Sequence, residues 1–223
     1  MTQPPTLFIG NKNYSSWSMR PWLALRWGKI AFEERMIPLG PRGLGPNPDI
    51  VAISPSGTVP VLVLPHGETI WDTMAICEWA HEAAPDAGLW PQDPLARALA
   101  RSASAEMHAG FASMRQEMPM NIKRRKISHD LSFAAKANVA RIDSLLAGLI
   151  DRCDGNGDGW LFGHRTIADA FYAPVATRFR TYNVAVLSAT QTWCDKVFAD
   201  PDFQDWEQGA IGETWTIAES DMV

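Results

Sequence analysis

The proline-rich segment at residues 84–94 constrains the fold most, because the hydrophobic pattern changes across it. Before it, short apolar runs such as residues 6–9 are bounded by Gly or Pro, which is typical of buried strands. After it, apolar residues follow helical spacing and no segment has the pattern of a strand. The prolines within the segment suit a semi-rigid linker. The sequence therefore predicts two domains, residues 5–84 and 95–223, joined by a linker at residues 85–94.

The first half of the chain predicts a mixed α/β domain. Val and Leu dominate residues 59–64, which form the clearest strand pattern in the chain. A hairpin turn and its return strand follow, and Asp72 or Thr73 then begins a helix. If Ser18 or a neighbour caps the first helix, Pro21 falls in its first turn, where proline is tolerated. The predicted elements are a strand at 6–9, a helix at about 19–28, a strand at 32–39, a loop at 40–58, strands at 59–64 and 69–71, and a helix to about residue 84.

The second half predicts an all-helical domain. Four aliphatic residues recur with the spacing of one helical face: Ile142, Leu145, Leu146 and Leu149. Thr166 and Asp169 stand where a capping box places its N-cap and N3 residues, so a helix should begin there. Pro174 lies well inside that helix and predicts a kink.

Composition and charge exclude several classes of protein. The 20 Lys and Arg residues against 25 Asp and Glu residues give a formal net charge of −5, which offers no basic surface to a nucleic acid or an anionic membrane. Three widely spaced cysteines exclude a disulfide framework and indicate a reducing compartment. No apolar run approaches the ~18 residues of a membrane span, and the N-terminus lacks the regions of a signal peptide. The five histidines show no metal-ligand spacing. We expect a soluble, cytoplasmic protein without a metal.

Two charged segments resemble binding motifs only in part. Residues 154–159 match the first half of a calcium-binding loop, but Arg165 occupies the position that should supply a bidentate Glu. This segment therefore predicts a Gly- and Asp-rich turn between helices. The basic run at residues 123–126 lies in an acidic protein without interleaved aromatic residues, so it predicts a solvated helix face or loop.

The most informative segment for chemistry is a serine turn between the first strand and the first helix. Ser15 and Ser16 lie where the unpaired N–H groups and the positive end of the helix dipole favour an anion. A serine hydroxyl is a poor general base, but it can donate a hydrogen bond to a bound thiolate and thereby lower the thiol's pKa. The alternative is that both serines only cap the helix.

Two other short motifs offer polar groups to an extended peptide. A cis bond between Val59 and Pro60 would turn the Val59 N–H and C=O toward such a peptide, which could pair with them as an added strand. A trans proline that begins an edge strand is the alternative. The Thr73 hydroxyl and the first helical N–H groups suit a carboxylate, whereas the Asp72 carboxylate suits an ammonium. Asp72 alternatively serves only as an N-cap.

In their order and spacing, these three motifs resemble those of the glutathione transferase superfamily. The resemblance covers nearly the whole chain and includes residues 161–163 (Leu-Phe-Gly) before the Thr166 capping box. The serine turn is similar to that of the serine-type classes, including the zeta class with its maleylacetoacetate isomerase activity. The implied fold class is an α/β thioredoxin-like N-terminal domain plus an all-α C-terminal helical domain.

The resemblance implies that the chain binds glutathione as a cosubstrate and uses no other cofactor. Ser15, or failing it Ser16, is then the catalytic donor to the thiolate. The implied glutathione-binding residues are Trp17, Thr58, Val59, Pro60, Asp72 and Thr73, with Asp72 and Thr73 at the γ-glutamyl end. The second substrate would occupy an apolar pocket between the domains, for which the candidates are Met107, Phe111 and Met114. Core packing is the alternative for each of these three.

Two positions depart from the family pattern. Thr58 stands where many relatives carry Lys or Gln before the Val-Pro pair, so one contact to the glycine carboxylate is missing or made elsewhere. Trp17 stands where the zeta class has Cys, and its bulky ring argues against maleylacetoacetate isomerisation. Trp22, Trp27 and Trp71 also flank the expected site, where they either shape it or fill the core behind it.

We therefore expect a cytoplasmic, homodimeric glutathione S-transferase that conjugates glutathione to a small hydrophobic electrophile, with a role in detoxification. The alternatives are a glutathione-dependent isomerase of the maleylacetoacetate type and a non-catalytic glutathione-binding or interaction module.

Overall fold

The first half of the chain contains a four-stranded sheet. The computed structural model describes residues 3–40, 47–125, 130–153 and 158–221. The first half contains β1 (Thr6–Ile9), α1 (Ser16–Trp27), β2 (Glu33–Met36), α2 (Pro48–Val51), β3 (Val61–Val63), β4 (Thr69–Ile70) and α3 (Thr73–Ala83). The strand order is β2-β1-β3-β4, with β1 parallel to β2 and antiparallel to β3. Leu7 and Ile9 of β1 are fully buried, as the twofold alternation of side chains along a strand requires.

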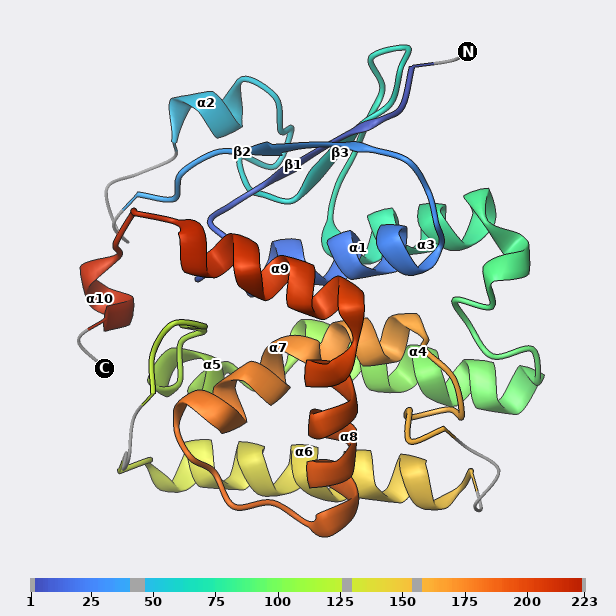
Figure 1. The fold of residues 1–223 in the computed structure, drawn as a ribbon, viewed down its shortest axis with the longest axis vertical. Helices are drawn as coiled ribbons and strands as arrows, with labels where there is room; N and C mark the ends of the chain where they lie inside the picture. Colours follow the sequence, from blue (N-terminus) through green and yellow to red (C-terminus); the bar gives the residue numbers. More distant parts are fainter. Residues whose placement is uncertain (1–2, 41–46, 126–129, 154–157, 222–223) are drawn as a thin grey trace.

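Helices cover both faces of this sheet. Figure 1 shows α1 and α3 between the sheet and the helical half, with α2 on the opposite side. The helix α2 lies within the predicted loop at residues 40–58, so that prediction missed it. Its signal was local, because Asn47 is the N-cap and Pro48 the first helical residue. The element order is that of a thioredoxin-like domain, which confirms the predicted fold of the first half.

The first helix begins earlier than predicted. Its N-cap is Ser15, so Pro21 lies in the interior of α1 and not in its first turn. Proline has no N–H to donate to the carbonyl of Trp17 one turn earlier. The Thr73 hydroxyl donates to that oxygen at 2.9 Å instead. A side chain from α3 thus supplies the hydrogen bond that Pro21 cannot make.

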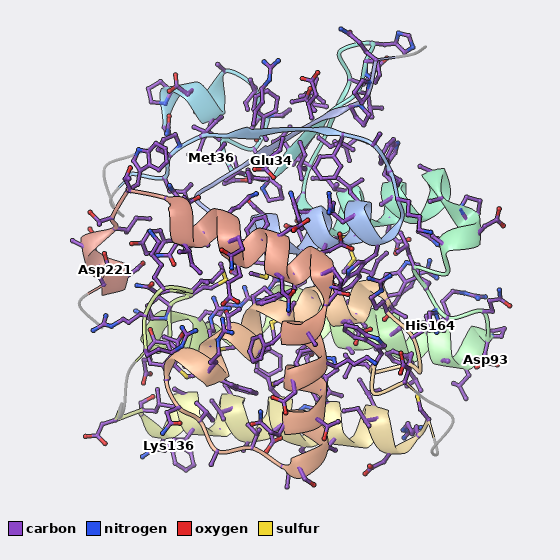
Figure 2. The ribbon with its side chains drawn as sticks, in the orientation of Figure 1. Glu34, Met36, Asp93, Lys136, His164 and Asp221 are labelled. Carbon is purple, nitrogen blue, oxygen red and sulfur yellow. The ribbon has the colours of Figure 1, made fainter. Side chains whose placement is uncertain are left out.

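The linker is a packed joint and not an open spacer. A short 3₁₀ turn (Pro85–Ala87) precedes Leu89 and Trp90, both of which are buried. The Leu89 carbonyl accepts a hydrogen bond from the Ile167 N–H at 2.9 Å. His164 lies beside the linker (Figure 2), with its Nε2 3.0 Å from the Gly88 carbonyl oxygen.

Among its described residues, the second half contains helices and loops but no strand. It contains α4 (Pro94–Ala109), α5 (Ala112–Glu117), α6 (Phe133–Asp151), α7 (Ile167–Thr181), α8 (Ser188–Ala199), α9 (Pro201–Gly212) and α10 (Ala218–Asp221). The predicted apolar face of α6 packs inward, with Ile142, Leu146 and Leu149 buried. The capping box of α7 forms as predicted, and α7 is one helix that includes Pro174. Residues 154–157 of the Gly- and Asp-rich turn lie outside the described residues.

The central helix of the second half is α7, which is buried along nearly its whole length. It packs against α1, α4 and α8, so it joins the two halves of the molecule. None of the helices in the described chain is long and apolar enough to cross a lipid bilayer.

Candidate functional site

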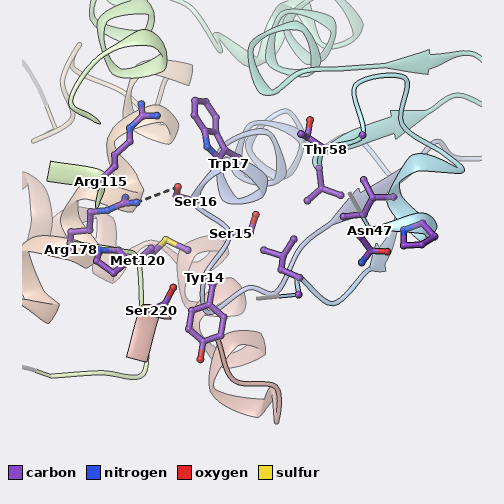
Figure 3. A pocket seen from close by; sticks show the side chains of 17 residues that line it. Tyr14, Ser15, Ser16, Trp17, Asn47, Thr58, Arg115, Met120, Arg178 and Ser220 are labelled. Atoms are coloured by element: carbon purple, nitrogen blue, oxygen red, sulfur yellow. Dashed lines mark hydrogen bonds between the residues drawn. The ribbon is translucent and has the colours of Figure 1, made fainter. Parts of the chain in front are cut away.

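A cavity of about 680 Å³ opens between the two halves of the molecule. Figure 3 shows Ser15, Ser16 and Trp17 at its centre, Arg115 and Arg178 on one side, and Asn47 and Thr58 on the other. Five residues predicted from the sequence line this cavity: Ser15, Ser16, Trp17, Thr58 and Val59.

Ser15 caps α1 and also takes part in a small network of hydroxyl groups. Its Oγ accepts a hydrogen bond from the Ser18 N–H at 3.3 Å and donates one to Ser18 Oγ at 2.8 Å. Ser18 Oγ also accepts from the Gly10 N–H at 3.1 Å. Ser15 is therefore a true N-cap, and its hydroxyl lies on the cavity wall at the positive end of the helix dipole.

Ser16 lies beside an arginine from the helical half. The Arg178 guanidinium donates to Ser16 Oγ at 3.4 Å, as the dashed line in Figure 3 shows. Two further bonds fix this guanidinium, from Nε to the Met118 carbonyl at 2.8 Å and from Nη1 to the Pro174 carbonyl at 3.2 Å. Because Arg178 is buried and held on several sides, it presents a fixed positive charge next to the serine turn.

Three guanidinium groups gather near this turn. Burial, together with the charges of Arg115 and Arg178, lowers the pKa of Arg20 well below its ordinary value. Burial also lowers the pKa of Arg115. Among the ion pairs of the described residues, none includes Arg20 or Arg115. The resulting positive potential favours an anion in the cavity.

Trp17 links these charges to the cavity. The guanidinium carbons of Arg20 and Arg115 lie 4.4 and 4.7 Å from the centre of its ring. Cations at such distances from an aromatic face are attracted to its electron density. Trp17 is also in edge contact with His108, with ring centres 5.1 Å apart. The ring is thereby held in a fixed place at the cavity wall, whereas Trp22 and Trp27 are buried in the core and Trp71 is largely exposed.

The Val-Pro motif forms the edge of the cavity next to the sheet. The peptide bond between Val59 and Pro60 is cis, as one of the two sequence-based alternatives had it. Among the described residues, no hydrogen bond joins the Val59 N–H or C=O to another group. Thr58 lines the cavity, and its hydroxyl pairs with Ser56 Oγ at 2.7 Å.

Asp72 and Thr73 lie at the start of α3 and do not line the described cavity wall. Asp72 caps α3, with Oδ1 accepting from the Met74 N–H at 2.9 Å. Its Oδ2 lies 3.1 Å from Nε2 of His108, a residue of the helical half. Thr73 is buried and bonded to the carbonyl of Trp17, so both residues are joined to the cavity through their neighbours.

The three candidates for a second-substrate pocket lie in the hydrophobic core. Met107 and Met114 are fully buried and Phe111 nearly so, and none of them lines the cavity. Arg115, the residue after Met114, faces the cavity instead. Core packing was the sequence-based alternative for each of these residues, but the sequence could not show which neighbouring residues reach the cavity.

Sequence reasoning missed Arg115, Arg178, Met120 and Ser220 as cavity residues. A signal existed for Arg178, which lies seven residues, about two helical turns, after the buried Phe171 on the same face of α7. An arginine on a buried helical face needs polar partners, and such a position is a candidate for function. The other three residues carry no comparable local signal.

Comparisons with known proteins identify the family of this chain. The N-terminal domain model of glutathione S-transferases matches residues 14–83, and the C-terminal domain model matches residues 132–210. The chain is 27% identical over 149 residues to a maleylacetoacetate isomerase of Pseudomonas aeruginosa and 28% identical over 124 residues to a probable maleylacetoacetate isomerase of Caenorhabditis elegans. These matches cover 63% and 56% of this chain. They span 65% and 56% of the two isomerases, less than two thirds of either. It is 28% identical over 176 residues to glutathione S-transferase 1 of Dianthus caryophyllus, covering 78% of this chain and 76% of that protein.

Solved structures share the whole fold. A glutathione S-transferase from Rhodospirillum rubrum F11 is 25% identical, with a TM-score of 0.69 over 98% of this chain and 99% of that one. A glutathione transferase homologue from Burkholderia gl BGR1, solved with bound glutathione, is 23% identical, with a TM-score of 0.70 over 95% of this chain and 99% of that one. Since the two domain models together match more than half of the chain, this protein belongs to the glutathione S-transferase superfamily.

Proposed function

We propose that the protein is a glutathione S-transferase that directs the glutathione thiolate at a small electrophile in the cavity. One observation carries the proposal: the serine turn at the positive end of α1 lines a cavity in which Arg115 and Arg178 lie beside it. Hydroxyl donors and nearby cations both favour the thiolate over the thiol. The bound glutathione in the Burkholderia relative supports the same ligand here.

Ser15 is the proposed donor to the sulfur. Its O–H now donates to Ser18 Oγ, an oxygen that also accepts from the Gly10 N–H. When the Ser15 hydroxyl turns toward a thiolate, Ser18 Oγ therefore keeps a partner. Ser16, beside Arg178, is the second candidate for the same role.

In the remaining proposed contacts, glutathione binds along the edge of the first domain. The N–H and C=O of Val59 would pair with the cysteinyl residue as an added strand. Asp72 would take the γ-glutamyl ammonium, with Thr73 at the same end, and Thr58 and Trp17 would complete the wall.

The chemistry is a nucleophilic substitution or addition. The thiol proton leaves to solvent, the thiolate sulfur forms a bond to an electrophilic carbon, and a leaving group, where present, departs with its bonding electrons. The protein contributes a thiol pKa lowered from ~8.5 and a fixed orientation of the two reactants. We also propose a homodimer that acts in detoxification, which the family resemblance supports, and a cytoplasmic location, which the free cysteines support.

The experiment that tests the proposal compares wild type with Ser15→Ala and Ser16→Ala. We expect Ser15→Ala to lower kcat/KM for glutathione and chlorodinitrobenzene by about 100-fold, the typical cost of one preorganised donor to an anion. Ser102→Ala, on the exposed surface of α4, is the control and should match wild type. Failure of the wild type to bind glutathione in calorimetry would end the proposal. A larger loss in Ser16→Ala would transfer the donor role to Ser16.

A second candidate function is a glutathione-dependent isomerase of an unsaturated diacid. The observation that favours it is the cationic wall of Arg115 and Arg178, which suits a carboxylate better than a neutral electrophile. In that reaction the thiolate adds to the double bond, the resulting carbon–carbon single bond rotates, and the thiolate leaves again as the double bond re-forms. Glutathione is then not consumed, so the loss of free thiol during turnover distinguishes the two enzymes. Tight glutathione binding without turnover of any electrophile would instead identify a binding module.

A further inference from the structure

The segment after α9 returns from the helical half to the serine turn. We call residues 213–221, which include α10, the α10 strap. In Figure 1, α10 lies at the edge of the molecule, and Figure 2 marks its Asp221 there. Ser220 of the strap lines the same cavity as Tyr14 and Ser15 (Figure 3). The strap is therefore part of the wall of the candidate site.

Glu213 ties the start of the strap to the loop before the serines. Its carboxylate accepts hydrogen bonds from two successive backbone N–H groups, that of Lys12 at 2.5 Å and that of Asn13 at 3.1 Å. Burial raises the pKa of the Glu213 carboxyl, while these two bonds lower it. A carboxylate partly removed from water is thus used to fix the backbone of this loop.

Asp221 ties the other end of the strap to the next residue of the same loop. Both of its carboxylate oxygens lie 3.1 Å from the Tyr14 hydroxyl, which donates to them. Oδ1 also accepts from Asn121 Nδ2 at 2.7 Å. Asn121 in turn accepts from Asn13 Nδ2 at 3.1 Å. Asp221 therefore holds Tyr14 directly and Asn13 through Asn121.

The basic run holds the strap itself. The Lys123 ammonium donates to the Glu213 carbonyl, and the Arg124 guanidinium donates to the Asp221 carbonyl. Between these two anchors, the side chain of Ile217 is buried. The basic run, which the sequence predicts to be a solvated helix face or loop, thus bonds to both ends of the strap.

The loop that the strap holds lies outside the helices and strands, and the 122–123 backbone, Trp206 and Glu34 also bond to it. Residues 10–14 belong to no helix or strand, and the backbone bonds of Tyr14 and Ser15 run back to the Asn11 carbonyl at 3.1 and 2.8 Å. Ser15 follows directly, so the direction of its hydroxyl depends on how this loop is held.

We propose that the α10 strap is the positioning element of the serine turn, and that Glu213 and Asp221 are positioning residues which act through the Lys12 and Asn13 N–H groups and the Tyr14 hydroxyl. The proposal rests on the proposed function, in that the serine turn is the site of the thiolate. Neither carboxylate lines the cavity, so each should influence the sulfur only through the loop.

The first experiment measures amide hydrogen exchange in the free protein and needs no glutathione. It compares wild type, Glu213→Ala, Asp221→Ala and, as a control on the exposed part of the strap, Thr216→Ala. We expect exchange within residues 11–16 to accelerate about 10- to 100-fold in the first two variants, because each loses charge-assisted hydrogen bonds. Exchange in α7 should stay at the wild-type rate, which shows that the variants fold.

The second experiment measures the thiolate absorbance of bound glutathione against pH. We expect the thiolate fraction at neutral pH to fall about tenfold in Glu213→Ala and Asp221→Ala, because Ser15 is no longer aimed at the sulfur. Asp221→Asn keeps one acceptor oxygen and should recover part of that fraction. A purely structural role for the strap would lower thermal stability without changing the thiolate fraction.

The two experiments separate the strap from the proposed function. Unchanged exchange at residues 11–16 in both Ala variants overturns the strap proposal, whatever the protein binds. Accelerated exchange with an unchanged thiolate fraction also overturns it, since the turn would then not need the strap. Absence of glutathione binding by the wild type overturns the proposed function, while the exchange experiment still decides whether the strap holds the turn.

Discussion

The starts of α1 and α7 differ in how their polar groups are bonded, although both helices have a hydroxyl residue at the N-cap. At α7, the buried Asp169 carboxylate accepts four hydrogen bonds, from the Thr166 N–H and hydroxyl, the Leu161 N–H and Trp193 Nε1, at 2.8–3.0 Å. At α1, no acidic residue lies in the first turn, and the cap is the Ser15 hydroxyl at 3.3 Å from the Ser18 nitrogen.

This difference separates a structural helix start from a functional one. The α7 start is closed, because Thr166 and Asp169 are fully buried and bonded to each other, and the Ile167 N–H is bonded to the Leu89 carbonyl. The α1 start lies on a cavity and is surrounded by guanidinium groups, so it remains able to receive an anion. A variant at α7 should therefore change stability, and a variant at α1 should change chemistry.

The largest effect should come from Asp169→Asn at α7. The amide keeps one acceptor oxygen and places a donor against the remaining donors, so we expect the free energy of unfolding to fall by about 2–4 kcal/mol. The activity per folded molecule should be unchanged, because Asp169 does not line the cavity. Urea unfolding measures the loss, with exposed Asp86→Asn as the control. A variant as stable as wild type would show that the carboxylate is dispensable.

Arg20→Met tests the opposite expectation at α1. Arg20 is a buried cation, and replacing such a group with an apolar side chain of similar volume is often neutral for stability. We expect the free energy of unfolding to stay within about 1 kcal/mol of wild type, while kcat/KM falls about tenfold as the positive potential at the thiolate decreases. Exposed Arg35→Met is the control. A stability loss without a change in kcat/KM would make Arg20 a structural residue.

Thr73→Val tests whether the Thr73 hydroxyl replaces the hydrogen bond that Pro21 cannot make in α1. Removing the hydroxyl leaves the Trp17 carbonyl without its donor from α3, which should cost about 1–2 kcal/mol of unfolding free energy. In a Pro21→Ala background the new backbone N–H at position 21 can donate to that carbonyl, so the same substitution should cost less. A double-mutant cycle by chemical unfolding measures the coupling. An equal loss of unfolding free energy in both backgrounds would show that the Thr73 hydroxyl does not compensate for Pro21.

The smallest effect concerns pH and Asp169. Burial raises the pKa of this carboxyl above its ordinary value of 3.8, although four hydrogen bonds lower it. A raised folded-state pKa contributes stability that is present below the unfolded pKa and lost as the pH rises through the folded pKa. The stability advantage of wild type over Asp169→Asn should therefore be greater in acid and shrink as the pH rises above 3.8. Unfolding curves over this range measure it, and an advantage that grows with pH would reverse the assignment.

Much of the fold followed from local patterns in the sequence. The strand at residues 6–9, the helical face of Ile142, Leu146 and Leu149, and the capping box at Thr166 each depend on residues near one another in the chain. Element boundaries were less certain, since α1 begins at Ser16 and places Pro21 in the helix interior. Short elements such as α2 were missed because a single turn carries only a cap and a proline as its signal.

The residues of the candidate site also fall into two groups, those that the sequence predicted and those that it did not. The serine turn and the Val59–Pro60 pair were predictable because turn and strand-start chemistry is local. By contrast, Arg115, Arg178 and Ser220 reach the cavity from three elements of the helical half. Their convergence depends on how those helices rotate and pack, and hydrophobic burial does not fix this rotation, because it has no preferred direction.

The sequence by itself thus determined the two kinds of structure, their order, and a hydroxyl-bearing helix start suited to an anion. Only the tertiary structure decided what surrounds that start: a cationic wall from α5 and α7, and a strap that returns to hold its loop. The physical reason is the separation along the chain over which each kind of interaction acts. Caps, turns and periodicity act over a few residues. The charges and anchors that complete this site lie far away along the chain: Arg178 is 162 positions from Ser16, and Glu213 is 201 positions from Lys12.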